Sequence, residues 1–320
     1  MLESGSSPKA DVPLERESKP DPTQAQTLHP SDNVSSSLPD YLKFTCDDSV
    51  VGKELHYYGR NRVLEHTTSN GEVLALKVNT ARSLKRSEAD MMHYAATNGV
   101  LAPKVCGVYD IVTEKRIARV MVSERLRGMP LAYVWRDLSE ADQASIKDQL
   151  RDQIRKMRSC TQPYIGRIGK AETRNLYDTN FVRYCGPFED EESFDNWCLK
   201  RLHGFGIQRW WYQRILQKKR KKPSGGFVLT HGDLSPRNIM VDGTTITGII
   251  DWAHSGFYPE HVEYAVAFGV KRVGIPDWWL PVLQEVLEPC SEDLVKFADR
   301  IQGRIGSIYP DDRDAAKEDK

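Results

Sequence analysis

The chain has 320 residues, enough for one large domain or two lobes, and 39% of them are hydrophobic, which argues against a wholly disordered protein. Its 45 Lys and Arg balance 45 Asp and Glu, so no net charge attracts nucleic acid or an anionic membrane, and we expect neither as a partner. The six cysteines form no C-x-x-C pair, which argues against zinc and a disulfide framework. No apolar run is long enough to span a membrane and the first residues lack a signal-peptide core, so we expect a cytoplasmic protein.

Composition divides the chain into four parts. Residues 1–38 are rich in Ser, Pro, Asp and Lys and have few large apolar side chains, so we expect a disordered tail. Residues 39–125 are predicted to form a small, β-rich N-lobe, and residues 126–309 a larger, mostly helical C-lobe. Residues 310–320 are predicted to be a flexible charged tail.

The N-lobe pattern predicts a small β-sheet with one helix. Asn70-Gly71 favours a tight hairpin turn, because these residues tolerate a positive φ. A helix is predicted over 82–98, where Gly99 and then Pro103 end it. The predicted strands are 62–67, 72–79, 104–112 and 116–124.

Beyond residue 130 the pattern is mainly helical. Ser139 followed by Asp142 is typical of a helix start, and an apolar stripe follows at Ile146, Leu150, Ile154 and Met157. Further helices are predicted at 189–202, 206–219, 260–270, 278–287 and 292–301, with strands at 227–230, 238–241 and 245–250. The fold class is therefore α+β.

The segment FVLTHGDLSPRNIMVDGTTITGIIDW, residues 227–252, contains the strongest chemical signal. Transfer of a phosphoryl group from ATP requires oxygen ligands for Mg²⁺ and a carboxylate beside the acceptor hydroxyl. Asp233 on a loop can face the acceptor, while Asn238 at the end of that loop can turn its amide oxygen to a metal. Asp251 ends the next apolar strand and can approach the same metal.

The stretches LTHGDLSPRNIMVD and IIDW resemble the catalytic motifs of the aminoglycoside phosphotransferase family, which has a bilobal, protein-kinase-like fold. YIGRIG, GPFEDEESFDNW and SGFYPEHVEY look like the pattern of its fungal members, and the resemblance covers about residues 41–301. It implies that Asp233 is the catalytic base and that Asn238 and Asp251 are metal ligands. It also implies that His231 belongs to the catalytic group, where it supports the loop structurally.

The N-lobe offers a nucleotide site that can be judged separately from this motif. Ala75 and Lys77 share one face of a strand, so an adenine ring can lie on the small residue while the ammonium group reaches the phosphates. Glu88 falls on the apolar stripe of the helix, where a buried carboxylate needs a cation, and Lys77 is the predicted partner. The connector after the last strand would hold the edge of the adenine through backbone groups. The predicted nucleotide contacts are Val63, Ala75, Lys77, Glu88, Glu124 and Leu126.

The sequence therefore predicts an ATP- and Mg²⁺-dependent phosphotransferase that moves the γ-phosphate to a hydroxyl of a small polar molecule. It does not determine the acceptor or the oligomeric state. The alternative is a non-catalytic, kinase-like binding protein. No G-x-G-x-x-G precedes Lys77, and Ala253 and Val262 stand where the family commonly has Glu and an aromatic residue, which motivates that alternative.

Overall fold

The computed structural model describes residues 52–58, 61–112, 117–177, 184–200, 206–219, 226–270 and 274–305. All of them belong to one compact unit, Phe44–Lys320. The tails predicted at 1–38 and 310–320 lie outside the described residues. The lobe boundary near residue 125 stays a prediction.

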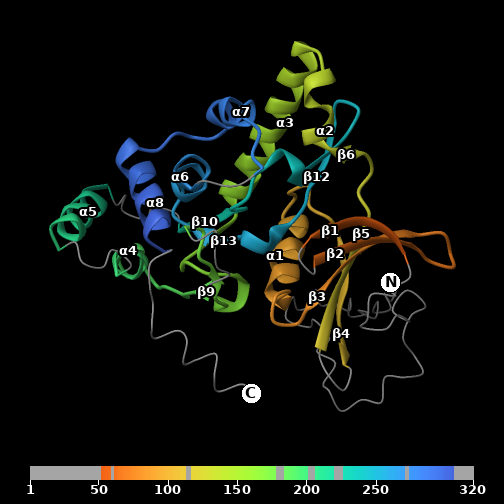
Figure 1. Ribbon diagram of the computed structural model, residues 1–320, viewed down its shortest axis with the longest axis horizontal. Helices are drawn as coiled ribbons and strands as arrows, with labels where there is room; N and C mark the ends of the chain where they lie inside the picture. The colour runs from red at the N-terminus through yellow and green to blue at the C-terminus, as the bar shows by residue number, and fades with distance from the viewer. Residues whose placement is uncertain are drawn as a thin grey trace, which may run out of the picture. The chain divides into compact units, whose positions relative to one another are not determined.

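A five-stranded antiparallel sheet forms the β-rich part, with strand order β1-β2-β3-β5-β4 (Figure 1). The strands are β1 (Lys53–Tyr58), β2 (Asn61–Thr67), β3 (Val73–Thr80), β4 (Val105–Val112) and β5 (Ile117–Glu124). The predicted hairpin between β2 and β3 is present, and Gly71 has the positive φ of 84° that the turn requires. The outer strand β1 was not predicted.

Helix α1 (Arg86–Thr97) lies against this sheet (Figure 1). It begins four residues later than predicted, because the N–H groups of Ser83 and Leu84 bond the Thr80 carbonyl in a separate turn. Arg86 Nη1 donates to the Val108 carbonyl at 3.0 Å, which ties the start of the helix to β4. The buried face of α1 carries Glu88 among apolar residues, as predicted.

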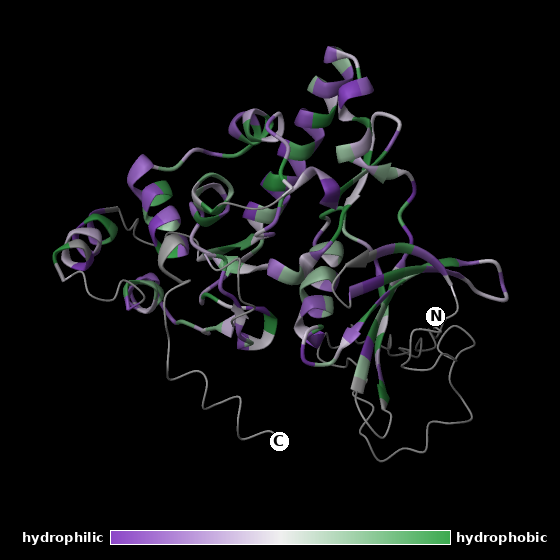
Figure 2. Ribbon diagram, viewed as in Figure 1, coloured by the Kyte–Doolittle hydropathy of each residue, from purple (hydrophilic) through white to green (hydrophobic). Residues whose placement is uncertain are grey.

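The remainder of the chain is mostly helical. Its α-helices are α2 (Leu131–Val134), α3 (Glu140–Ser159), α4 (Glu191–Leu199), α5 (Gly206–Lys219), α6 (Val262–Gly269), α7 (Trp279–Val286) and α8 (Glu292–Ile305). Ser139 caps α3 by accepting the Asp142 N–H, and the predicted stripe of α3 is buried. Figure 2 shows hydrophobic and hydrophilic bands along α3, as expected for a helix with one face in the core. No described helix is long and apolar enough to cross a membrane.

Short strands position the predicted catalytic segment. They are β6 (Met129–Pro130), β7 (Thr161–Gln162), β8 (Thr173–Arg174), β9 (Tyr184–Cys185), β10 (Phe227–Thr230), β11 (Ile239–Asp242), β12 (Thr245–Ile249) and β13 (Gly256–Tyr258). Two of the sheets run β13-β10-β7 and β12-β11-β6, so the loop from β10 to β11 connects one sheet to the other. Because both sheets lie in the apolar core, this loop is held at both ends.

Candidate active site

Lys77 connects two acidic side chains that are distant in the sequence. Its Nζ lies 2.6 Å from Glu88 Oε1 and 2.9 Å from Asp251 Oδ1. Lys77 belongs to β3, Glu88 to the buried face of α1, and Asp251 follows β12. The Lys77–Glu88 pair predicted from the sequence is present, and Asp251 joins it.

The ion pairs set the charges of this cluster. Burial alone would lower the pKa of Lys77, but Asp251 and Glu88 raise it above its ordinary value. Burial would raise the pKa of Asp251, but the ammonium group of Lys77 holds it well below its usual range. Lys77 is therefore a cation and Asp251 an anion at neutral pH. Glu88 is only 4% exposed, so its charge depends on Lys77 for compensation.

The backbone at Asp251 adopts a left-handed conformation, with φ 63° and ψ 65°. This region is uncommon for residues other than glycine, although Asp tolerates it better than most. Such strain persists where the surrounding structure imposes it, and it is concentrated at functional sites. The surrounding structure therefore holds Asp251 in this conformation.

The loop predicted to be catalytic, residues 231–238 and named the catalytic loop below, carries Asp233, which is 6% exposed. Its Oδ2 accepts a hydrogen bond from Arg237 Nη2 at 3.0 Å. Asn238 donates from Nδ2 to the Asp233 carbonyl at 2.9 Å, and its own carbonyl accepts the Ile250 N–H at 2.8 Å. Asn238 is thus fixed beside the strand end that leads to Asp251.

His231 is fully buried and both of its ring nitrogens have partners within the chain. The Asp233 N–H donates to Nδ1 at 3.2 Å, so Nδ1 is an acceptor and Nε2 carries the hydrogen. Nε2 then donates to the Ile250 carbonyl at 3.1 Å. The ring also packs edge-to-face on Trp252, with centroids 4.9 Å apart. His231 therefore connects the catalytic loop to the strand end that precedes Asp251.

Two supports of the loop were missed by sequence reasoning. Glu263 of α6 is 3% exposed and accepts the backbone N–H of His231 at 2.7 Å and that of Gly232 at 3.0 Å. Trp279, fully buried at the start of α7, donates from Nε1 to the Leu234 carbonyl at 2.8 Å. Two signals for Glu263 were available, its charge within the apolar sequence of α6 and its place in the stretch SGFYPEHVEY.

Arg167 was also missed, although it lies within the YIGRIG stretch quoted above. Its guanidinium is completely buried and donates to three groups. Nη1 bonds Ser87 Oγ at 2.9 Å, Nε bonds the Ser255 carbonyl at 3.1 Å, and Nη2 bonds the Ala253 carbonyl. Arg167 therefore joins the start of α1, near Glu88, to the segment that follows Asp251.

Asn238 and Asp251 are the side chains that could hold a metal. Because Asn238 donates through its amide nitrogen, its amide oxygen is directed to another side and can act as a ligand. A carboxylate and an amide oxygen are hard donors that suit Mg²⁺, which also retains water and phosphate ligands. In the described part of the chain no group of three or more His, Cys, Asp and Glu residues could hold a metal, so a site here would include the amide.

The residues predicted to contact adenine lie on β2, β3 and the connector. Val63 is paired with Lys77 in the β2–β3 register, and both Val63 and Ala75 are half-buried. The Glu124 N–H donates to the Lys104 carbonyl at 2.9 Å, so this backbone group of the connector is occupied within the protein. Leu126 is buried where β12 passes close to the connector.

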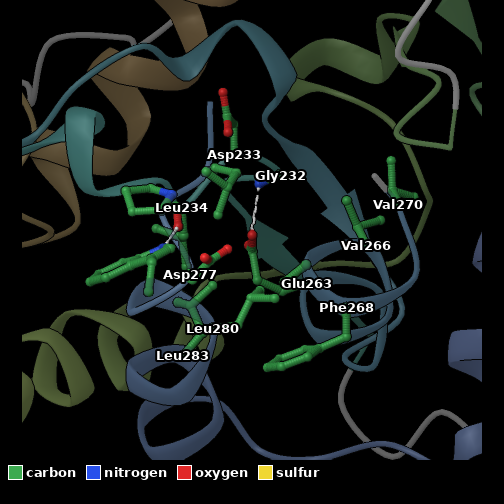
Figure 3. A pocket seen from close by; sticks show the side chains of 14 residues that line it. Gly232, Asp233, Leu234, Glu263, Val266, Phe268, Val270, Asp277, Leu280 and Leu283 are labelled. Atoms are coloured by element: carbon green, nitrogen blue, oxygen red, sulfur yellow. Dashed lines mark hydrogen bonds between the residues drawn. The ribbon is translucent and has the colours of Figure 1, made fainter. Parts of the chain in front are cut away.

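A cavity of about 250 Å³ borders the catalytic loop (Figure 3). Gly232, Asp233 and Leu234 form one wall, and α6, α7 and the chain between them form the others. Figure 3 shows the Asp233 carboxylate at the edge, pointing away from the apolar side chains. The cavity is therefore adjacent to the predicted base, and sequence reasoning did not foresee it.

Comparison with known proteins gives a family match and a fold match. The model of the phosphotransferase enzyme family matches residues 59–288. A thermostable mutant of aminoglycoside phosphotransferase APH(4)-Ia, in complex with ADP and hygromycin B, is similar in structure with a TM-score of 0.50 and 16% identity, over 73% of this chain and 75% of that chain. At this sequence identity the similarity shows a shared fold and nothing more specific.

Two other solved structures are similar to the chain. An amicoumacin kinase in complex with AMP-PNP and Ca²⁺ has a TM-score of 0.45 and 14% identity, over 81% of this chain and 84% of that chain. A macrolide 2′-phosphotransferase from Brachybacterium faecium has a TM-score of 0.44 and 16% identity, over 77% of this chain and 80% of that chain. The search of curated proteins found no match.

Proposed function

The chain belongs to the phosphotransferase enzyme family, and we propose that it transfers the γ-phosphate of ATP to a hydroxyl group of a small molecule. The observation that carries the proposal is the double ion pair of Lys77 with Glu88 and Asp251. Kinase-type phosphoryl transfer requires a lysine fixed by a helix glutamate and an aspartate presented to the metal. All three side chains meet here from separate parts of the chain.

The nucleotide would lie on the face of β3 that carries Ala75 and Lys77. Lys77 is held as a cation and would pair with the phosphates, while Ala75 and Val63 would contact the base. The connector that includes Glu124 and Leu126 would border the adenine. This assignment makes residues 39–125 the nucleotide-binding lobe and residues 126–309 the catalytic lobe.

Asn238 and Asp251 would hold Mg²⁺, which when bound neutralises charge on the phosphate oxygens. The donor set fits, because the Asp251 pKa is depressed and the carboxylate is ionised at neutral pH. Lys77 shares this carboxylate, so the chain keeps it charged and oriented before ligands arrive. Asn238 is oriented by its bond to the Asp233 carbonyl.

Asp233 would orient the acceptor hydroxyl and receive its proton. The acceptor oxygen forms a bond to the γ-phosphorus, the bond from that phosphorus to the ADP oxygen breaks, and the proton passes to the Asp233 carboxylate. Arg237 fixes one carboxylate oxygen of Asp233, and the catalytic loop is anchored through His231. These contacts would keep the carboxylate in one position through the reaction.

The test measures ATP turnover against a panel of hydroxylated small molecules. Asp233→Asn should lower turnover by about 10²–10⁴-fold, the contribution of a positioned base. Asp242→Asn, the same change at the exposed end of β11, should leave turnover unchanged. A loss below tenfold in Asp233→Asn would remove Asp233 from this role. If ATP with Mg²⁺ raises the melting temperature but no panel member is phosphorylated, the non-catalytic alternative is favoured.

A further inference from the structure

We propose that helix α5 binds the surface of an anionic phospholipid bilayer. Five exposed residues make up the binding surface, named the α5 face below: Ile207, Trp210, Trp211, Arg214 and Lys218. The proposal does not depend on the phosphotransferase function, because none of these residues belongs to the candidate active site.

One side of α5 is packed against the rest of the chain. Tyr212 and Leu216 are buried, and the ring centroid of Tyr212 lies 5.3 Å from that of Phe297 in α8. The helix contacts both α4 and α8, and Figure 1 shows it at the left edge with these two helices beside it. Because the inner side holds α5 in place, the outer side can meet a partner while the helix stays packed.

The outer side carries large apolar groups. Ile207, Trp210 and Trp211 are 85%, 55% and 45% exposed, and the spacing i, i+3, i+4 places them on one side of the helix. Where the structure describes side chains, no other helix or strand leaves more than one large hydrophobic residue exposed. Single exposed apolar residues are common on any surface, whereas a cluster of them marks an interaction site.

The same side of α5 is cationic. Arg214 and Lys218 follow at i+7 and i+11 from Ile207, and the Arg214 guanidinium lies 4.8 Å from the centroid of the Trp210 ring. The sequence of α5, GIQRWWYQRILQKK, contains four basic residues and no acidic one. The balanced charge of the whole chain conceals this local excess, so the expectation of no membrane partner does not extend to α5.

Exposed tryptophans beside cations suit a helix at a lipid–water boundary. Trp is enriched at this boundary because its ring is apolar and its N–H can bond polar groups. The long side chains of Arg214 and Lys218 can extend their charges to lipid phosphates while the indole rings lie at the level of the head groups. The 14 residues of α5 are too few to span a bilayer, so the helix would lie along its surface.

Two other partners fit the α5 face less well. In a symmetric dimer this face would meet itself, and it has no acid to pair with Arg214 and Lys218. An acidic protein that encloses a basic helix needs access to its sides, whereas Tyr212 and Leu216 are already packed. A lipid surface requires only the outer side.

The first test is cosedimentation of the full-length chain with vesicles, without nucleotide or acceptor. The chain should bind vesicles of equal parts phosphatidylcholine and phosphatidylserine at least about tenfold more tightly than vesicles of phosphatidylcholine alone. Added salt should weaken this binding, because it screens the charges. Equal binding to both kinds of vesicle, or binding to neither, would overturn the proposal.

Matched charge variants assign the binding to α5. Arg214→Gln with Lys218→Gln should lower the affinity for the mixed vesicles by about 10–30-fold, since each cation near an anionic surface contributes about fivefold. Arg155→Gln with Lys156→Gln makes the same charge change at exposed residues of α3 and should lower the affinity by less than about threefold. Equal urea midpoints would confirm that the variants are folded, and an equal loss of affinity in both pairs would refute the assignment.

Tryptophan variants test the apolar part of the α5 face. Trp210→Ala with Trp211→Ala should lower the affinity at least about tenfold and reduce the blue shift of tryptophan emission that mixed vesicles produce in the parent. Tyr133→Ala, at an exposed aromatic residue of α2, should do neither. An unchanged affinity and emission shift in the double tryptophan variant would refute the role of these rings.

The same proteins distinguish a lipid surface from a protein partner. Calcium-loaded calmodulin serves as the probe for an acidic protein that binds basic helices. Binding of calmodulin without binding of vesicles would assign the α5 face to an acidic protein and overturn the proposal. Self-association that is lost in the double tryptophan variant, again without vesicle binding, would assign the face to a second copy and also overturn it.

Discussion

Glu263 should stabilise the catalytic loop through its two backbone partners, and Glu263→Gln tests this. The carboxylate accepts His231 N–H at 2.7 Å on Oε2, and Gly232 N–H at 3.0 Å on Oε1 and 3.3 Å on Oε2. A glutamine can keep its oxygen at the Oε2 position, but its NH₂ group then faces the Gly232 N–H, donor against donor. One charge-assisted hydrogen bond contributes about 1.5–3 kcal/mol, and an unsatisfied buried donor costs about 1–3 kcal/mol. We expect Glu263→Gln to lower the free energy of unfolding by about 2–4 kcal/mol.

The assay is urea unfolding at neutral pH, compared among three variants. Glu263→Ala removes both acceptors and leaves a cavity, so it should cost more than Glu263→Gln. Glu260→Gln makes the same chemical change at an exposed position and should stay within about 0.5 kcal/mol of the parent. Because the loop also carries Asp233, ATP turnover of Glu263→Gln should fall even where the variant is fully folded.

The order of the three variants is the decisive result. A Glu263→Gln protein with the same urea midpoint and slope as the parent would show that the two backbone N–H groups find other acceptors, and the reasoning would fail. Lower stability with unchanged turnover would retain the hydrogen bonds as a stabilising feature. It would refute the claim that they position the catalytic carboxylate.

Three further predictions concern a close backbone approach and the ion pairs. Gly128→Ala should lower the free energy of unfolding in urea by about 2–5 kcal/mol, because φ is 83° and the new Cβ would lie 1.9 Å from a backbone oxygen of β11. The control Gly243→Ala has φ 59° and open space around the new Cβ, so it should lower the free energy of unfolding by only about 1–2 kcal/mol. Lys77→Met should lower the free energy of unfolding by about 3–5 kcal/mol, because it leaves the buried Glu88 without its cation. The double variant Lys77→Met with Glu88→Leu should recover most of this stability, and a double variant without recovery would contradict the ion-pair explanation. The folded pKa of Asp251 lies below its unfolded value, so the ionised carboxylate stabilises the protein above about pH 4. This stabilisation is lost as the pH falls through the folded pKa. Asp251→Asn should therefore lose less stability than the parent between about pH 5 and pH 2, as measured by urea midpoints.

The sequence was sufficient to predict the groups that break a regular pattern. Glu88 stands out because it places a charge on a face of α1 that is otherwise apolar, and a buried carboxylate requires a cation. Lys77 was identified by its place two residues after the small Ala75 on the same strand face. Residue types suited to phosphoryl transfer, at fixed spacing, identified Asp233, Asn238 and Asp251. The structure brings Asn238 and Asp251 to adjacent strand ends. Their roles stay predictions until turnover is measured.

Other features could not be predicted because they depend on where the backbone comes to lie. Arg167 bonds two main-chain carbonyls and a serine hydroxyl from separate segments, and no local pattern indicates those partners. The occupied N–H of Glu124 follows from the approach of Lys104, a contact set by the sheet register. The start of α1 was misplaced because a turn at Thr80 satisfies the backbone before the helix begins.

The supporting residues were harder to predict than the groups proposed for chemistry because the two sets make their contacts with different kinds of atoms. The groups proposed for chemistry act through their own side chains, so the residue type and its spacing indicate the role. Glu263 and Trp279 bond main-chain atoms of the loop, and main-chain atoms are the same in every residue, so the residue types do not show which atoms they contact. Variants of these supports should therefore change turnover through the position of Asp233 and leave the charges at Lys77 and Asp251 unaltered. A loss of nucleotide binding in Glu263→Gln equal to its loss of turnover would show that the two halves of the site are not separable in this way.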